Sequence, residues 1–174
     1  MKWLIFEGEC CFAQWVWETQ VMVPSDLARG DLHTFAAWPT TPVPKGPPGV
    51  YAIFRAAEFL YVGISWREPS TTATGTSKGL WGRLDSHASG RRSGDQFCIY
   101  VCDRYVIGDL SVEEIREVAA GSRSLDRMTR DYIRTHLAYR FVTTTTGGEA
   151  RDLETAVRRY GLLEHGKPAL NALL

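Results

Sequence analysis

Hydrophobic and polar positions in the middle of the chain predict two strands followed by a helix. Residues 49–54 and 59–64 are rich in β-branched and aromatic residues, and the short polar interruption between them suits a hairpin connection. After a loop, residues 78–87 predict a short helix with one apolar side. Arg83 and His87 are four residues apart, so they lie on the same polar face of this helix. This part of the chain is therefore where we expect the chemistry.

The pattern after this region predicts two more strands and three more helices. Ser111 and Glu114 have the spacing of a capping box, which opens a helix, and Gly161 is expected to end the last helix. The predicted elements are strands at 96–102 and 139–143 and helices at 111–120, 125–137 and 149–160. We therefore expect an α/β fold of the α+β kind, in which helices surround a small mixed, largely antiparallel sheet of three to four strands.

Residues 1–48 differ from the rest of the chain because they are crowded with tryptophan and phenylalanine and end in a proline-rich segment. Residues 2–6 fit a strand, whereas the nearly unbroken apolar run at 11–23 fits either a strand or a helix. Proline lacks the donor that a helix interior or a central strand needs, so residues 39–48 predict a linker. We expect an N-terminal extension at 1–48 and one domain at 49–174. The aromatic residues either pack on that domain or contact a second copy or nucleic acid.

Composition and charge exclude several classes of protein. With 174 residues, 44% of them hydrophobic, the chain can bury one substantial core. Its 20 basic and 20 acidic residues cancel, so only a local patch could attract nucleic acid. The four cysteines are too few for a disulfide scaffold and lack the paired spacing of a structural zinc site, so we expect reduced thiols. The first residues show neither a signal peptide nor a membrane span, which makes the protein's expected location cytoplasmic.

Five short elements occur in an order and spacing that resemble the GIY-YIG nuclease family. They are Gly49-Val50-Tyr51, Tyr61-Val62-Gly63, Arg83 within a helix, Glu154 within a later helix and Asn171 near the end. His87, four residues after Arg83, is similar to the histidine of the arginine and histidine pair in the restriction-endonuclease-like branch. Valine replaces isoleucine in both name-giving triplets, which keeps a β-branched residue. The resemblance runs from residue 49 to residue 171 and implies the GIY-YIG endonuclease fold.

The resemblance implies a divalent-metal-dependent DNA endonuclease that hydrolyses phosphodiester bonds. Glu154 would hold Mg²⁺ or Mn²⁺ through a carboxylate oxygen, and the ion would keep most of its waters. Tyr51 would be the general base, although the ordinary tyrosine pKa of about 10 requires nearby positive charge to favour the phenolate. Arg83 would contact the scissile phosphate, Tyr61 would orient water or phosphate, and His87 either assists Tyr51 or accepts its proton. The implied catalytic residues are Tyr51, Tyr61, Arg83, His87, Glu154 and Asn171.

A local basic rim is the expected contact for double-stranded DNA. Lys78, Arg91 and Arg92 lie on the predicted helix and in the turn beyond it. Any sequence preference would come from residues 1–48, from the polar loop 65–77 or from the second subunit of a homodimer. Two alternatives remain open: a GIY-YIG-like module that binds nucleic acid without cutting it, and an unrelated α+β protein in which these residues are structural. The biological role is open between restriction, repair and mobile-element functions.

Overall fold

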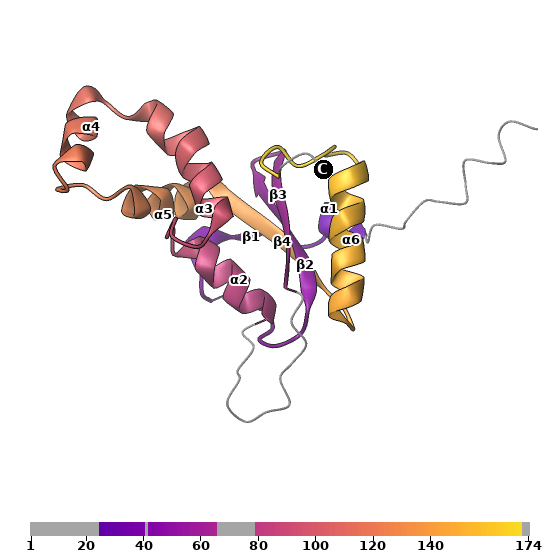
Figure 1. Ribbon diagram of the computed structural model, residues 1–174. Helices are drawn as coiled ribbons and strands as arrows, with labels where there is room; N and C mark the ends of the chain where they lie inside the picture. The colour runs from indigo at the N-terminus through magenta and orange to yellow at the C-terminus, as the bar shows by residue number, and fades with distance from the viewer. Residues whose placement is uncertain (1–24, 41, 66–78, 172–174) are drawn as a thin grey trace, which may run out of the picture.

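The fold is built on a four-stranded antiparallel sheet with helices on both faces (Figure 1). The computed structural model describes residues 25–40, 42–65 and 79–171. The strand order is β1-β4-β2-β3, and the strands are β1 (His33–Thr34), β2 (Gly49–Arg55), β3 (Glu58–Ser65) and β4 (Leu137–Thr143). β2 and β3 form the predicted hairpin, and β4 confirms the strand expected at 139–143. The expected α+β architecture with a largely antiparallel sheet is therefore confirmed.

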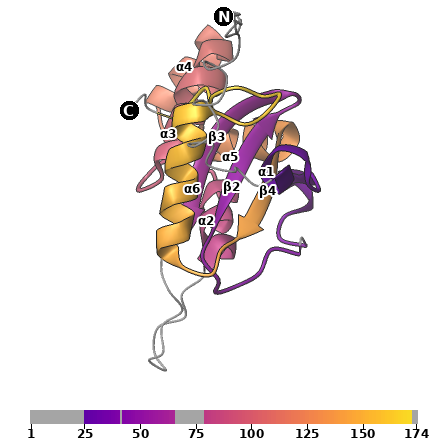
Figure 2. The ribbon, with the colours of Figure 1, turned by 90° about the vertical axis from the view of Figure 1, so that its right-hand side faces the viewer.

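Helices cover both faces of the sheet. One face carries α1 (Ser25–Arg29) and α6 (Gly147–Tyr160) (Figure 2). The other face carries α2 (Gly79–Ala88), α3 (Gln96–Val101), α5 (Leu125–His136) and the short 3₁₀ helix η1 (Phe35–Ala37). α3 continues into a π-helical segment, η2 (Cys102–Val106), and a 3₁₀ turn, η3 (Ile107–Asp109), which lead to α4 (Val112–Ala119). In Figure 1, α4 lies far from the sheet. Within the described ranges, every helix is too short or too polar to cross a membrane.

Local signals place the helix ends where the sequence predicts them. The Ser111 hydroxyl accepts a hydrogen bond from the Glu114 N–H, and the Glu114 carboxylate accepts one from the Ser111 N–H, so the capping box is present. Gly161, with φ of 85°, ends α6, and its N–H donates to the Val157 carbonyl. A positive φ of this size favours glycine. The helices α4, α5 and α6 confirm those expected at 111–120, 125–137 and 149–160.

The central strand β2 supplies apolar side chains to both faces of the sheet. Val50, Ala52 and Phe54 pack into the core under α1 and α6. Tyr51 and Ile53 point to the opposite face and pack among α2, α3 and α5. All five side chains are essentially buried, because β2 has neighbouring strands on both sides and helices on both faces. Tyr51 therefore reaches the helical layer from a rigid position.

The strand expected at 96–102 is wrong, because this segment is the helix α3 and the first residue of η2. Asp95 caps the helix by accepting hydrogen bonds from the N–H groups of Phe97 and Cys98. Phe97, Cys98, Val101 and Cys102 are all fully buried, and their spacing is that of one helical face rather than of a strand. The capping aspartate decides the conformation of a short apolar run that fits either element by hydrophobicity alone.

Residues 25–48, expected as part of an extension, pack into the same folded unit. Leu27 of α1 lies in the core beneath α6, and Phe35 and Trp38 lie in the core on the other face. The Trp38 Nε1–H donates to the Asp85 carboxylate on α2 at 3.0 Å. The aromatic residues in this part of the chain thus contact the main core, which is one of the two roles expected for them. Outside the described residues lie the segments 2–6 and 11–23, Cys10, Cys11, Lys78 and nearly all of the loop 65–77.

Candidate active site

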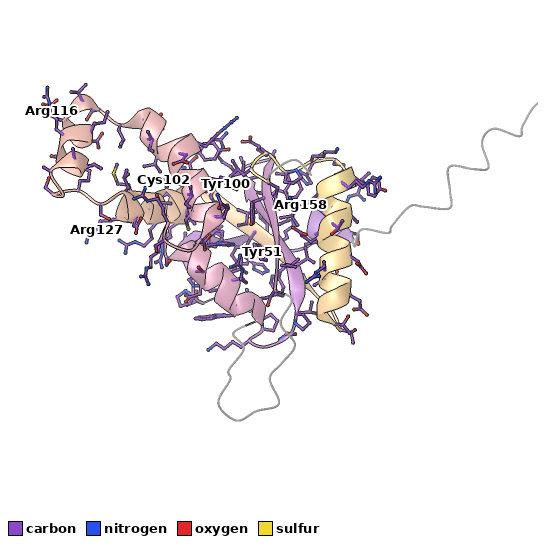
Figure 3. The ribbon with its side chains drawn as sticks, in the orientation of Figure 1. Tyr51, Tyr100, Cys102, Arg116, Arg127 and Arg158 are labelled. Atoms are coloured by element: carbon purple, nitrogen blue, oxygen red, sulfur yellow. The ribbon has the colours of Figure 1, made fainter. Side chains whose placement is uncertain are left out.

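A buried hydrogen bond joins the first predicted tyrosine to the predicted histidine. Tyr51 on β2 points toward α2 (Figure 3), where its hydroxyl lies 2.6 Å from Nε2 of His87. Both side chains have no exposed surface. His87 and Arg83 occupy successive turns of α2, so the helix that the sequence predicted does present both toward the tyrosine. Tyr51, Arg83 and His87 lie close together because α2 packs against β2.

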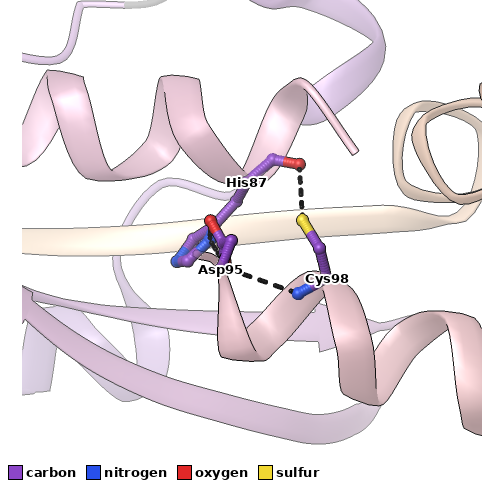
Figure 4. A group of neighbouring side chains, drawn as sticks. All are labelled: His87, Asp95 and Cys98. Atoms are coloured by element: carbon purple, nitrogen blue, oxygen red, sulfur yellow. Dashed lines mark hydrogen bonds and ion pairs between the residues drawn. The ribbon is translucent and has the colours of Figure 1, made fainter. Parts of the chain in front are cut away.

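Asp95 holds the other nitrogen of the histidine ring (Figure 4). Nδ1 of His87 lies 2.8 Å from Oδ2 and 3.0 Å from Oδ1 of Asp95. The Asp95 carboxylate also accepts hydrogen bonds from the Ser86 hydroxyl at 2.7 Å and from the N–H groups of Phe97 and Cys98. An ionised carboxylate has no proton to donate and acts as an acceptor only. The His87 Nδ1 therefore carries the proton and donates it to Asp95. Nε2 is then the acceptor for the Tyr51 hydroxyl.

The surroundings fix the protonation states of this chain of three groups. Burial lowers the pKa of His87 below its ordinary 6.5, although the bond to Asp95 opposes this shift. Burial alone would raise the pKa of the Asp95 carboxyl, but the bonds from His87, Ser86 and the Cys98 N–H bring it down to about 2. Burial raises the pKa of Tyr51 well above its usual range. At neutral pH the arrangement is a neutral tyrosine, a neutral imidazole and an aspartate.

Arg83 and Tyr61 lie next to this hydrogen-bonded chain. The Arg83 side chain is exposed, and its positive charge lowers the pKa of Tyr51 against the larger effect of burial. Tyr61 on β3 is partly buried, and its ring centre lies 6.0 Å from that of His87 and 6.5 Å from that of Tyr51. Burial raises the pKa of the Tyr61 hydroxyl, while Arg83 opposes the shift. Four of the six predicted catalytic residues therefore gather around one point of the β2–β3 hairpin.

Glu154 approaches from the opposite face of the sheet. It lies on α6, its side chain is 15% exposed, and its Oε1 accepts a hydrogen bond from Nη1 of Arg158 at 3.4 Å. Burial raises the pKa of the Glu154 carboxyl, with the charges of Arg158 and Arg151 opposing the shift. Its negative charge also raises the pKa of Tyr61, so the two groups interact around the edge strand β3. The carboxylate thus reaches the margin of the site rather than the buried chain of Tyr51 and His87.

Asn171 contacts the edge strand of the sheet. Its side-chain NH₂ donates to the Val62 carbonyl at 2.9 Å, and its Oδ1 accepts from the Val62 N–H at 2.8 Å. The N–H groups of Ala169 and Leu170 donate to the carbonyls of Phe59 and Leu60. The segment 169–171 therefore lies alongside β3 and bonds to backbone groups of Phe59, Leu60 and Val62. In this structure both polar atoms of the Asn171 amide are committed to the strand that carries Tyr61.

Among the residues that the structure describes, two sets offer ligand atoms for a metal ion. Glu154 offers one partly buried carboxylate, a hard oxygen ligand of the kind that Mg²⁺ and Mn²⁺ accept while water and phosphate complete the shell. His87, Asp95 and Cys98 also place one ligand atom each within 4.8 Å of one another. Their nitrogen, oxygen and sulfur donors suit zinc better than magnesium. However, burial raises the pKa of the Cys98 thiol, which lies 3.5 Å from the His87 carbonyl. The Asp95 carboxylate already accepts hydrogen bonds from four donor groups. These existing bonds count against a metal ion at His87, Asp95 and Cys98, whereas Glu154 offers a single hard oxygen donor.

The predicted basic rim is only partly visible. Lys78 lies outside the described residues. Arg92 forms an ion pair with Asp126 of α5, with Nε and Oδ1 2.8 Å apart, so much of its charge is used within the protein. Arg91 is exposed.

The described cysteines, Cys98 and Cys102, are free and buried, which agrees with the reduced thiols expected for this pair.

The Tyr51 side chain lies directly across Gly63, the last residue of the second name-giving triplet. Tyr51 and Gly63 are paired across β2 and β3, and a Cβ atom on Gly63 would come within 2.5 Å of the tyrosine Cζ. We expect Gly63→Ala to lower the free energy of unfolding by about 1–3 kcal/mol, because Tyr51 has no room to move in a packed core. Urea unfolding checks this value. Gly108→Ala is the matched control, since a Cβ there meets no atom within 4 Å, and an equal loss in both variants would contradict the expectation.

Asp95 is the site residue that the sequence interpretation missed. Its signal was present, because an aspartate directly before a helix is a common N-cap. Assigning 96–102 to a strand removed that helix and left Asp95 in a loop without a role.

No known protein family, curated protein or solved structure matches this chain. The geometry described above is therefore the basis for assigning a function.

Proposed function

We propose that this protein is a divalent-metal-dependent endonuclease that cleaves duplex DNA, with an active site of the GIY-YIG kind. The observation that carries the proposal is the buried chain from the Tyr51 hydroxyl through His87 to Asp95. A tyrosine and a histidine at this distance can move a proton, and a carboxylate on the far nitrogen fixes the ring. Arg83 beside this chain and Glu154 at the margin of the site would supply the opposite charges that phosphodiester hydrolysis uses.

His87 is the group that removes the proton of Tyr51 in this proposal. The pKa of Tyr51 is raised by burial, so the tyrosine does not ionise on its own at neutral pH. Neutral His87 has a free Nε2 lone pair aimed at the hydroxyl, and Asp95 stabilises the imidazolium that forms. Tyr51 then takes the proton of the attacking water. Tyr51 has no exposed surface, so a water reaches it only after neighbouring side chains move.

Arg83 and Glu154 act on the phosphate in this proposal. The exposed Arg83 guanidinium can donate two parallel hydrogen bonds to phosphate oxygens and stabilise the charge that builds up on them. Glu154 would hold Mg²⁺ or Mn²⁺, and a bound ion polarises the phosphate and neutralises the leaving oxygen. Tyr61, whose pKa is influenced by both Arg83 and Glu154, would orient the substrate. Asn171 keeps the strand that carries Tyr61 in position.

We expect Asp95→Asn to slow cleavage by roughly 10- to 10⁴-fold, because a neutral amide neither fixes the His87 ring nor stabilises its protonated form. The pH profile separates this effect from simple unfolding. Removing the carboxylate lowers the pKa of His87 further, so the acid limb of the cleavage rate should move to lower pH. Single-turnover rates measured between about pH 5 and pH 8 show the shift.

The matched control for Asp95→Asn is Asp126→Asn, which removes a carboxylate from the neighbouring ion pair with Arg92. It should leave the position of the acid limb unchanged. If the acid limb of Asp95→Asn stays at its wild-type position, or moves upward while circular dichroism shows a folded protein, the proposed support of His87 by Asp95 is wrong.

The direct test of the proposed function is nicking of a supercoiled plasmid in the presence of Mg²⁺ or Mn²⁺ and of a chelator. Metal-dependent conversion to open-circular and linear DNA is the expected result. Tight binding of duplex DNA with no cleavage in either metal would instead support the non-cleaving binding module. If the protein neither binds nor cleaves DNA, the remaining interpretation is an unrelated α+β protein in which these residues are structural.

A further inference from the structure

Arginine side chains are concentrated on one part of the helical layer. Residues 89–94 and 125–136 together carry five arginines and two aspartates, although the whole chain has no net charge. The first range is the turn after α2, and the second is α5. A local excess of this size creates a positive potential that the neutral total conceals.

Several contacts hold this turn and the end of α2 against α5. The Arg92 Nε–H donates to Oδ1 of Asp126 at 2.8 Å. A Cβ atom placed on Gly90 would lie 2.5 Å from the Cα of Arg130, so the two backbones touch. The Arg134 Nε–H donates to the Ala88 carbonyl, at the end of α2, at 3.3 Å. The arginines of α5 are therefore fixed beside the helix that carries Arg83 and His87.

Three of these arginines form a stripe along α5, which we call the α5 stripe: Arg127, Arg130 and Arg134. Their spacing of three and four residues puts them on one side of the helix over about 10 Å. Arg127 and Arg134 are exposed, and among the described residues the Arg130 side chain forms an ion pair with its sequence neighbour Asp131, at 3.5 Å. Arg127 lies at the end of α5 in Figure 3, and exposed Arg91 lies in the adjoining turn. Exposed pairs between sequence neighbours contribute little, so most of this charge is available to a partner.

We propose that the α5 stripe, together with Arg91, binds the phosphate backbone of duplex DNA and so positions the substrate. The inference rests on the proposed nuclease function. Ala88, which the stripe contacts, is five residues after Arg83, or about 7.5 Å along α2. One duplex turn of about 34–36 Å therefore spans both the stripe and the site. Guanidinium groups suit phosphate because they donate paired hydrogen bonds and keep their charge. Such contacts orient the DNA without reading its sequence.

The test compares two variants that lose the same net charge. One carries Arg127→Gln, Arg130→Gln and Arg134→Gln. The other carries Arg29→Gln, Arg151→Gln and Arg159→Gln, three exposed positions on α1 and α6 across the sheet. Fluorescence anisotropy with a labelled duplex of about three helical turns, in a chelator that prevents cleavage, gives the dissociation constant at several salt concentrations.

We expect the α5 variant to bind at least tenfold more weakly and to lose about 2 to 3 units of the salt slope, since each phosphate contributes about 0.9. The control variant should keep the wild-type slope to within about one unit. The inference is overturned if the salt dependence of DNA binding by the α5 variant equals that of wild type, or if the control variant loses more slope than the α5 variant. Metal-dependent cleavage would still support the proposed function in that case. Wild-type protein that binds DNA without cleaving it, with the slope lost in the α5 variant, supports the stripe and contradicts the nuclease.

A second variant guards against damage to the fold. The side chains of Arg91 and Arg127 make no hydrogen bond or ion pair with other described residues, so Arg91→Gln combined with Arg127→Gln removes charge without breaking bonds of these kinds. It should lose about 1 to 2 units of slope at an unchanged melting temperature. An unchanged slope in this pair would contradict the stripe as well.

Discussion

Glu154→Gln is expected to abolish metal-dependent cleavage while leaving binding of duplex DNA intact. The amide keeps the size of the side chain, so α6 and its contact with Arg158 should persist. What it lacks is the negative charge that holds a divalent cation, and without the ion the leaving oxygen is not neutralised. We expect a loss of about 10³-fold or more, which corresponds to several kcal/mol of transition-state stabilisation.

The measurement for Glu154→Gln is the single-turnover cleavage rate across a magnesium titration, beside DNA affinity in chelator. Asp152→Asn is the matched control, because Asp152 is an exposed carboxylate on the same helix. A rate within tenfold of wild type, with the magnesium dependence of wild type, would remove Glu154 from the metal-binding role. Activity restored only at magnesium concentrations far above those that saturate wild type would indicate that the carboxylate raises the affinity for the ion.

Tyr51→Phe is expected to reduce the cleavage rate by about 10²- to 10⁴-fold, the range typical of removing a general base. The phenyl ring fits the same buried space, so the loss reflects the hydroxyl itself. The Nε2 of His87 loses its partner at the same time, which should lower the free energy of unfolding by about 1–3 kcal/mol. Rate and unfolding are therefore both measured.

Tyr139→Phe is the control for this substitution, because Tyr139 is an equally buried tyrosine in the same core. It should reduce stability without a large change in rate. A rate loss below tenfold in Tyr51→Phe would show that His87 takes the proton of water directly and that Tyr51 only orients it.

Local patterns predicted the hairpin and the later helices because their signals are contained in a few neighbouring residues. The β2–β3 hairpin follows from two β-rich runs with a short interruption, and α4 follows from a capping box. β1 could not be predicted in this way, since two residues form a strand only because β4 lies beside them. The helix α3 could have been predicted from the cap at Asp95.

The candidate site was predictable by residue type but not by connectivity. The family pattern named Tyr51, Tyr61, Arg83 and His87, and the structure brings these four together. It does not say that His87 is held by Asp95, because that bond depends on how α2 and α3 pack. A motif also does not distinguish a side chain that contacts substrate from one that bonds to the backbone. In this structure the Asn171 amide makes two hydrogen bonds to the backbone of Val62. Tertiary packing decides such roles.

The C-terminal segment beside β3 also limits how two copies of this protein could associate. Its bonds to Phe59, Leu60 and Val62 occupy backbone groups that an unprotected outer strand would offer to another chain. A continuous sheet running from one subunit into the next cannot form along that stretch while the segment stays in place. If the protein forms the homodimer that cutting both DNA strands could use, the subunits must meet through other surfaces. Replacing the contacts of residues 169–171 would expose these backbone groups of β3 and favour aggregation over ordered pairing.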